Sequence, residues 1–296
     1  MSTERVTYFL NAFRLPHWSK NALLVVPLIA AHKGTEPVLW LHGGYAVAAF
    51  SLAASSVYVV NDILDREEDR RHPFKRDRPF ASGRLTPKEG GIAALVLLAG
   101  SLAVALPLLP PLFAGIVGLY VATAALYSRY LKHLVVVDLL VLTGFYVLRL
   151  YAGGVATETP VSPWLLAFSL FFFLSLAVMK RYAALLTLRD HGADAASTQS
   201  YRIEDLGLLR SIGPASGYLS MLILALYINS EKVVELYTRP SLLWLTLPVL
   251  LYWLTRFWLR AHRGEMIDDP IAVALKDPVS YGTGVAVGAI MLAAAL

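Results

Sequence analysis

Cysteine is absent from all 296 residues of the chain, and charged residues are scarce, at 16%. The lack of cysteine excludes disulfide frameworks, thiolate metal sites and cysteine nucleophiles together. The low charge excludes an ordinary soluble domain, which contains about 25% charged residues. Hydrophobic residues instead make up 57% of the sequence. This composition is typical of a protein that lies largely within a membrane.

What the sequence has in abundance is long runs without charge. Four runs of 19 to 25 residues lie at 37–61, 159–179, 211–230 and 278–296. Each is close to the roughly 20 residues that a helix needs to cross about 30 Å of hydrocarbon. A fifth run, 91–126, is too long for one span and contains three prolines between positions 107 and 111. Because proline breaks a helix, we predict two helices there, at about 89–106 and 110–128.

Three further apolar segments complete the set. They are 21–32, 133–153 and 240–255. The first is short, but Lys20 and Lys33 flank it, and their long side chains can extend it by reaching toward the interface. We therefore predict an all-α polytopic membrane protein with nine transmembrane helices, no β-sheet and a single domain over 1–296.

The positions of the basic residues predict the orientation. With nine spans, 22 of the 26 lysines and arginines fall on the side of the N-terminus and three on the other. This asymmetry places the N-terminus in the cytoplasm of a bacterial inner membrane and argues against nucleic-acid binding. Residues 1–18 are expected to form an interfacial segment, and 62–88 and 180–210 to form cytoplasmic loops.

An acidic cluster follows the second expected span. Asp62, Asp65 and Asp69 stand at i, i+3 and i+7, which places them on one side of a helix. Like charges at this spacing repel one another, and hard oxygen ligands of this kind suit Mg²⁺, with Mn²⁺ as the alternative. The competing interpretation is a solvated loop in which nearby arginines neutralise the carboxylates. Those arginines are Arg66, Arg70 and Arg71.

A basic segment follows the acidic cluster directly. Lys75, Arg76 and Arg78 lie between Pro73 and Pro79, which favour a stiff, extended backbone. Cations beside a magnesium site are what a diphosphate needs, because arginine pairs with phosphate oxygens through two hydrogen bonds. The alternative is an ordinary positive-inside loop. Other candidate substrate ligands at the same expected ends are Lys20, Asn21, Asn61, Tyr127, Lys132, Lys180 and Arg181. Arg149 lies inside a span, where its role is either structural or functional.

These residues resemble the UbiA superfamily of membrane prenyltransferases. Its first aspartate motif has the form Asn-Asp-x-x-Asp-x-x-x-Asp, which Asn61, Asp62, Asp65 and Asp69 match without a gap. One branch, the decaprenyl-phosphate phosphoribosyltransferases, is more similar still. The shared stretches are Arg14-x-Pro16-x-Trp18-x-Lys20-Asn21, His72-Pro73-x-Lys75-Arg76-x-Arg78-Pro79, Tyr127-Ser128-x-x-x-Lys132, Asp138, Arg149-x-x-Ala152-Gly153-Gly154 and Lys180-Arg181-Tyr182. The chain departs from that branch at Ala184, where glutamate is common, and has only Asp190 and Asp194 where aromatic prenyltransferases carry a second aspartate motif.

The resemblance implies a UbiA-like bundle and a function. The donor would be phosphoribosyl pyrophosphate, the acceptor a polyprenyl phosphate, and the cofactor Mg²⁺ on Asp62, Asp65 and Asp69. The basic residues would bind the phosphates, and a homo-oligomer is compatible with this assignment. Two alternatives stay open: an aromatic polyprenyltransferase that uses a prenyl diphosphate, and a non-enzymatic transporter or scaffold.

Overall fold

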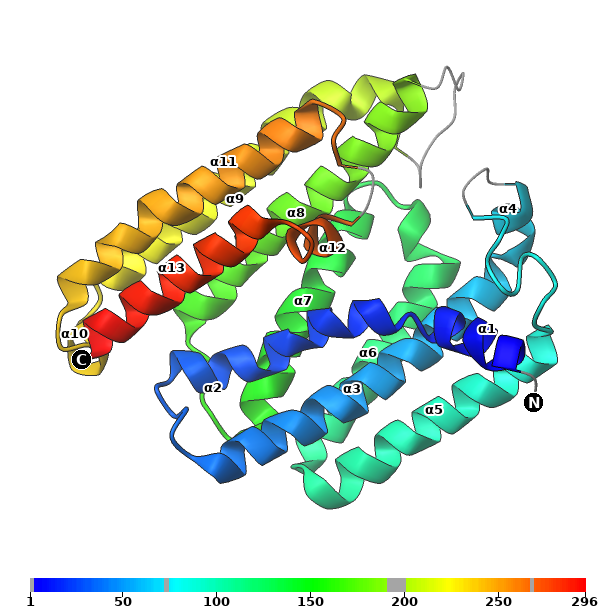
Figure 1. Ribbon diagram of the computed structural model, residues 1–296, viewed down its shortest axis with the longest axis horizontal. Helices are drawn as coiled ribbons and strands as arrows, with labels where there is room; N and C mark the ends of the chain where they lie inside the picture. Colours follow the sequence, from blue (N-terminus) through cyan, green and yellow to red (C-terminus); the bar gives the residue numbers. More distant parts are fainter. Residues whose placement is uncertain (1–2, 72–74, 191–200, 267–268) are drawn as a thin grey trace. The chain divides into compact units, whose positions relative to one another are not determined.

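The computed structural model describes residues 3–71, 75–190, 201–266 and 269–296 (Figure 1). These ranges contain helices and loops and no β-strand. Eight segments within them are long and apolar enough to cross a membrane. The prediction of an all-α, multi-pass membrane protein is therefore confirmed.

The spanning helices lie at the expected places. They are α3 (Pro37–Leu64), α5 (Pro87–Leu108), α6 (Pro111–Arg129), α7 (Val137–Ala156), α8 (Pro163–Asp190), α9 (Leu206–Ile228), α11 (Thr246–His262) and α13 (Pro278–Ala295). However, α8 continues eleven residues beyond the expected end at 179, into the segment 180–210 that was predicted to be a loop. Short 3₁₀ helices, η3 (Ile203–Asp205) and η4 (Pro240–Leu245), lead into α9 and α11. The long charge-free run divides as predicted, because α5 ends at Leu108 and Pro111 starts α6.

The first expected span, 21–32, has a different structure from the others. It is formed by the end of a 3₁₀ helix, η1 (Leu15–Val25), followed by the five-residue α2 (Val26–Ala30). It is therefore not one of the eight spanning helices of the described residues. A 3₁₀ helix rises about 2.0 Å per residue, so η1 and α2 together still extend roughly 30 Å. Sixteen residues thus reach a length that an α-helix needs about 20 to cover.

The remaining helices are short. They are α1 (Thr3–Phe13), α4 (Arg66–Arg71), η2 (Leu131–His133), α10 (Glu231–Leu236) and α12 (Pro270–Ala274). Among them, α4 continues from α3 after a single turn residue, Asp65. The acidic cluster therefore lies at the junction of α3 and α4.

The chain divides into two compact units. The first comprises Met1–Lys132 and Leu148–Val161, and the second comprises His133–Val147 and Ser162–Leu296. In the first, α3 packs chiefly against α5, and Figure 1 shows the two helices side by side. In the second, α8 packs chiefly against α9. The single domain over 1–296 and its three named segments stay predictions.

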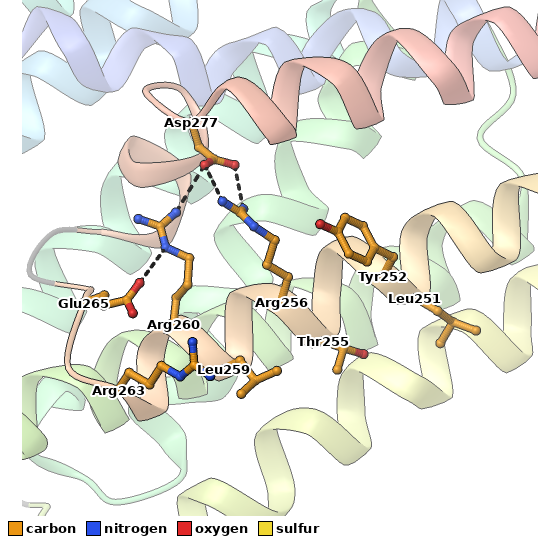
Figure 2. A pocket seen from close by; sticks show the side chains of 9 residues that line it. All are labelled: Leu251, Tyr252, Thr255, Arg256, Leu259, Arg260, Arg263, Glu265 and Asp277. Carbon is orange, nitrogen blue, oxygen red and sulfur yellow. Dashed lines mark hydrogen bonds and ion pairs between the residues drawn. The ribbon is translucent and has the colours of Figure 1, made fainter.

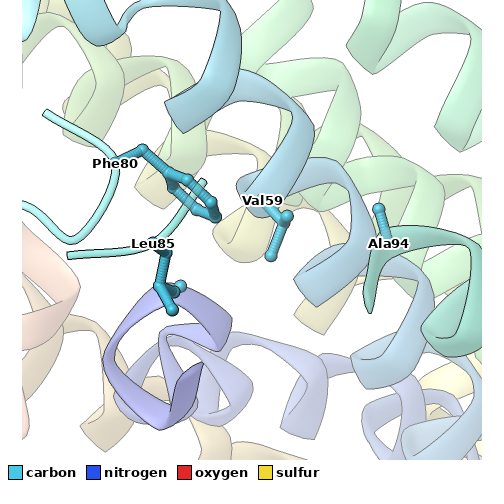
Figure 3. Packing of buried hydrophobic residues seen from close by; sticks show 5 residues of the cluster. Val59, Phe80, Leu85 and Ala94 are labelled. Carbon is cyan, nitrogen blue, oxygen red and sulfur yellow. The ribbon is translucent and has the colours of Figure 1, made fainter. Parts of the chain in front are cut away.

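A small apolar cluster in the first unit anchors the loop after the acidic residues. Phe80 and Leu85 are almost fully buried and pack with Val59 of α3 and Ala94 of α5 (Figure 3). Thr86 then starts α5 with a capping box in which its side chain and that of Glu89 bond each other's backbone N–H. The loop that carries Arg78 is thereby held against α3 and α5 on the C-terminal side of this residue.

Gly153 marks a close approach of two backbones in the first unit. A Cβ atom built on this residue of α7 would collide with the backbone carbonyl of Leu24 in η1. We expect Gly153→Ala to lower the free energy of unfolding by about 3 kcal/mol, since a backbone cannot yield as a side chain does. Gly144→Ala is the matched control, because no atom lies within 4 Å of the corresponding Cβ position in the same helix. Thermal unfolding of both variants in detergent tests this, and equal melting temperatures would contradict it.

The absence of cysteine makes the topology directly testable. Asp77, Glu158 and Glu235 are exposed, so a cysteine introduced at each can be labelled without a native background. With the N-terminus in the cytoplasm, we expect Glu158→Cys and Glu235→Cys to react in intact cells with a membrane-impermeant maleimide. Asp77→Cys should react only after permeabilisation. The reverse pattern would invert the predicted orientation.

Candidate active site

The three aspartates lie at the junction of α3 and α4 in the first unit. The helical hydrogen bonds continue through the junction, from Asp65 N–H to the Asn61 carbonyl at 2.9 Å and from Asp69 N–H to the Asp65 carbonyl at 2.8 Å. At 100° per residue, a side chain seven positions on returns to within about 20° of the first, whereas one three positions on is about 60° away. Asp62 and Asp69 should therefore align better with each other than with Asp65.

One arginine confirms this alignment. The same nitrogen of Arg78, Nη1, lies 3.2 Å from Oδ1 of Asp62 and 2.8 Å from Oδ2 of Asp69. Both aspartates are buried, at 3% and 2% exposed. A cationic atom thus occupies a point that two carboxylates share.

Arg14 supplies a second cation to the same place. Its guanidinium donates to Oδ1 of Asp62 and lies 5.2 Å from the ring centre of Tyr58. The Arg14 backbone has the left-handed φ of 53°, which is costly for a residue with a side chain. Such a conformation persists only where the surroundings hold it, and strained residues cluster at functional sites. Sequence reasoning left Arg14 out of the candidate residues, although it begins the first shared stretch.

Asp65 makes a separate set of contacts. Lys132, in η2 just after α6, donates from Nζ to Oδ1 at 2.7 Å, and Asn61 donates from Nδ2 to Oδ2 at 2.9 Å. Lys132 is itself buried, at 7% exposed. Residues 61 and 132, far apart in the sequence, are thereby brought to the same carboxylate.

The partners of the aspartates differ from those in the solvated-loop interpretation. Arg66 and Arg70 pair with Glu67, at 3.2 and 3.1 Å. The aspartates are neutralised instead by Arg14, Arg78 and Lys132. The cluster is therefore a built arrangement of charges from four parts of the first unit.

The carboxylate ligands of this cluster suit a divalent cation at one pair, Asp62 and Asp69. No three His, Asp or Glu side chains come together as a metal-binding group in the part of the chain that the structure describes. Asp62 and Asp69 nevertheless place two carboxylate oxygens around one shared point, and Mg²⁺ commonly binds through one or two carboxylates. Asp65, engaged with Lys132, stands apart from this pair.

A cavity of about 420 Å³ opens beside the pair. Its lining residues are Tyr8, Asn11, Arg14, His17, Asp62, Asp77, Arg78, Pro79 and Arg84. Cationic side chains outnumber carboxylates on its wall. The cavity is therefore suited to an anionic group, held near the two aspartates.

Two predicted ligands lie next to this cavity along the chain. Lys75 is half-buried and Arg76 is exposed, and neither forms an ion pair within the described residues. Burial, followed by the charge of Arg78, lowers the pKa of the Lys75 ammonium group, and nearby carboxylates such as Asp69 oppose this effect. The negative charge of a bound phosphate would offset this effect by stabilising the protonated ammonium group of Lys75. His72 and Pro73 of the shared stretch lie outside the described residues.

Asn21 is buried and holds another polar residue, Arg149, in place. It is 1% exposed, donates to the Ser51 hydroxyl at 2.8 Å and accepts from Nε of Arg149 at 2.8 Å. The Arg149 guanidinium lies 5.1 and 5.2 Å from the ring centres of Phe50 and Tyr120. Asn21 thus orients a buried arginine inside the first unit. Lys20 and Tyr127, on η1 and α6, are both half-buried.

Lys180 and Arg181 lie on α8 in the second unit. Arg181 is buried and binds Asp138 through two hydrogen bonds, at 2.7 and 2.9 Å. Lys180 pairs with Asp269 at 3.0 Å. Both cations therefore have carboxylate partners within their own unit. Of the second acidic segment, Asp190 ends α8, and Asp194 lies outside the described residues.

The sequence signature of the UbiA prenyltransferase family covers residues 22–276. This range includes the aspartate pair, Asp65 and the basic segment. The chain belongs to the UbiA prenyltransferase family. Its members are membrane-embedded transferases, so the protein is an enzyme of this class.

Individual relatives within the family differ in how much of the chain they match. The nodulation protein NoeC of Azorhizobium caulinodans is 35% identical, over 96% of this chain and 92% of its own length. The uncharacterized protein y4nM of Sinorhizobium fredii is 36% identical over 93% of this chain, which spans only 54% of y4nM. The decaprenyl-phosphate phosphoribosyltransferase of Mycobacterium tuberculosis is 40% identical over 64% of this chain and 65% of its own length. The predicted resemblance to that branch is confirmed.

Solved structures of the family share the fold. A UbiA homolog from Archaeoglobus fulgidus, bound to GPP and Mg²⁺, has a TM-score of 0.66 and covers 96% of this chain and 97% of its own. The identity is 14%, so the likeness concerns the fold alone. The predicted UbiA-like fold is confirmed.

Proposed function

We propose that the protein transfers the 5-phosphoribosyl group of phosphoribosyl pyrophosphate to a polyprenyl phosphate and releases pyrophosphate. The observation that carries the proposal is the arrangement around Asp62 and Asp69, where a shared cation point adjoins a cavity with a cationic wall. The 40% identity to a decaprenyl-phosphate phosphoribosyltransferase supports the choice of donor.

The reaction exchanges one bond at the anomeric carbon of the donor. The bond from C1 of ribose to the diphosphate oxygen breaks, and the electron pair leaves with pyrophosphate. A phosphate oxygen of the lipid then forms the new bond to C1. Because this oxygen is already anionic near neutral pH, the reaction needs no general base. The main task of the protein is to hold two anions close together.

The residues divide this task by charge. Asp62 and Asp69 would hold the divalent cation, Mg²⁺ or Mn²⁺, which stabilises the charge that develops on the leaving diphosphate. Arg78, Arg76 and Lys75 would bind the phosphates of the donor, since Lys75 and Arg76 form no ion pair in the described part of the chain. Asp65, Lys132 and Asn61 support this arrangement. Five further residues stay predicted substrate ligands. In the first unit they are Lys20, Asn21 and Tyr127, and in the second unit they are Lys180 and Arg181.

The proposed location follows from the solubility of the two substrates. The donor is soluble, so the basic loops that bind it should face the cytoplasm, with the lipid held by the apolar helices. The protein would then lie in the bacterial inner membrane with its N-terminus in the cytoplasm. The asymmetry of lysine and arginine supports this orientation.

A transfer assay on membranes that contain the protein tests the proposal. Radiolabelled phosphoribosyl pyrophosphate is supplied with decaprenyl phosphate, and the labelled lipid is extracted and counted. Parallel reactions contain 4-hydroxybenzoate with a prenyl diphosphate. We expect label in the lipid and no prenylated aromatic product. Prenylation of the aromatic acid without ribosyl transfer would establish the aromatic alternative, and neither product in membranes with folded protein would favour a transporter or scaffold.

A further inference from the structure

A second cavity lies in the second unit, at the C-terminal end of α11. It has a volume of about 770 Å³. Arg256, Arg260 and Arg263 line it, and their spacing of four and three residues places them on one face of the helix. Partial negative charge at a helix C-terminus favours cations there. None of these arginines belongs to the candidate active site.

Two of the three arginines have structural partners. Arg256 binds Asp277 through two hydrogen bonds of 2.9 Å, and Arg260 reaches the same carboxylate at 3.3 Å (Figure 2). Arg260 also donates to Glu265 at 3.3 Å. Asp277 in turn caps the start of α13 by accepting from the Ser280 backbone at 2.9 Å. The hydrogen bond from Arg256, aided by those from Ser280, lowers the pKa of Asp277 to about 2. This network ties α11 to α13.

Arg263 takes no part in that network. It is exposed and has no ion pair or side-chain hydrogen bond among the described residues. Three arginines on the wall face two carboxylates, so the cavity keeps an excess of positive charge. The excess is located at Arg263 and at the Nη2 atom of Arg260, whose other nitrogens bond Asp277 and Glu265.

The end of the wall near Leu251 and Tyr252 is mainly apolar, and Leu259 continues the apolar surface beside the arginines. Leu251, Tyr252 and Leu259 line the same cavity and are 37%, 58% and 46% exposed. From residue 251 to residue 263 the helix rises about 18 Å, at 1.5 Å per residue. These residues belong to a segment that is apolar enough to span the membrane and ends at His262. The cavity therefore begins with apolar residues at 251 and 252, and all three of its arginines lie from residue 256 onward, toward the end of the spanning segment.

We propose that this cavity binds a phosphorylated membrane lipid, with its phosphate on Arg263 and Arg260 and its chain along Leu259, Tyr252 and Leu251. A soluble phosphate would contact the cationic end alone. A single phosphorylated lipid contacts the cationic end and the apolar residues together. The inference does not rest on the proposed transfer reaction, because it concerns a separate unit and a different set of residues.

Lipid retention by purified protein tests the site. Wild type and Arg263→Gln are exchanged into dodecyl maltoside micelles with fixed amounts of phosphatidylglycerol or of phosphatidylcholine, and bound lipid is measured by native mass spectrometry. We expect Arg263→Gln to retain phosphatidylglycerol about tenfold more weakly, the effect of one charge-assisted contact. Arg263→Lys, which keeps the charge, should recover most of the binding. Phosphatidylcholine should bind more weakly than phosphatidylglycerol to wild type, because its choline group opposes the basic wall.

The matched control is Arg210→Gln, which removes an exposed arginine of the same unit that does not line the cavity. It should leave retention unchanged. Equal retention by Arg263→Gln and Arg210→Gln would overturn the site. A third arm adds inorganic phosphate at millimolar concentration. Failure to displace the lipid supports the lipid assignment, and full displacement, with no preference for phosphatidylglycerol over phosphatidylcholine, would assign the site to free phosphate instead.

Discussion

Asp62→Asn is expected to lower transfer by about a hundredfold or more, the largest effect of any single change considered. The replacement keeps the shape of a side chain that is 3% exposed and removes its charge. The side chain at position 62 can then no longer share with Asp69 the cation that stabilises the leaving diphosphate. Loss of one preorganised electrostatic contact typically costs 10²–10³-fold in rate. The rate of lipid labelling in membranes with equal amounts of folded protein measures the effect.

The matched control for this change is Glu67→Gln, five residues further along. The Glu67 side chain is 60% exposed and contacts only Arg66 and Arg70 among its ion pairs. We expect it to keep nearly full activity. Asp62→Asn should also lower the melting temperature, because it removes the carboxylate that pairs with Arg14 and one of the two that pair with Arg78. Full activity of Asp62→Asn, or of wild type stripped of divalent metal with a chelator, would refute the assignment of a cation site.

Arg76→Ala is expected to weaken binding of phosphoribosyl pyrophosphate by about ten- to a hundredfold. Arg76 is exposed, lies two residues from Arg78 and forms no ion pair within the described residues. Its guanidinium is therefore available for a phosphate, and a hydrogen bond to a charged group contributes about 1.5–3 kcal/mol. Each 1.4 kcal/mol changes the affinity tenfold. Equilibrium binding of the labelled donor to purified protein gives the comparison directly.

Arg129→Ala serves as the control for Arg76. Arg129 is exposed at the end of α6, and its guanidinium lies 5.7 Å from the ring centre of Tyr130. Its removal lowers the net charge equally, so a general electrostatic effect would weaken donor binding in both variants alike. We expect a loss only with Arg76→Ala, and a much smaller change in the affinity for polyprenyl phosphate. Equal donor affinity of Arg76→Ala and wild type would exclude this role for Arg76.

Much of the fold could be predicted from the sequence because a membrane imposes one simple requirement. A spanning segment must be apolar over a set length and must bond its own backbone, so helices such as α5 and α6 follow from hydropathy and proline positions alone. The segment at 21–32 is the exception. It is apolar but short, and nothing in its composition distinguishes an α-helix from the more extended η1.

The candidate site was predictable only in part. The spacing of Asp62 and Asp69 places them together, because seven residues nearly complete two helical turns. The identity of their partners was not predictable in the same way. Arg66 and Arg70 are nearest in sequence yet pair with Glu67. The cation that pairs with Asp62 is instead Arg14, which precedes the segment 21–32 in the chain.

The sequence by itself determined the membrane class, the positions of most spans, the family and the acidic and basic residues that are candidates for the reaction. Local spacing and composition suffice for these properties. Only the tertiary structure decided which charges meet: Arg78 between Asp62 and Asp69, Lys132 on Asp65, and Arg181 on Asp138 within the second unit. Buried charges must find partners to offset the loss of water, and which partners they find depends on how distant helices pack.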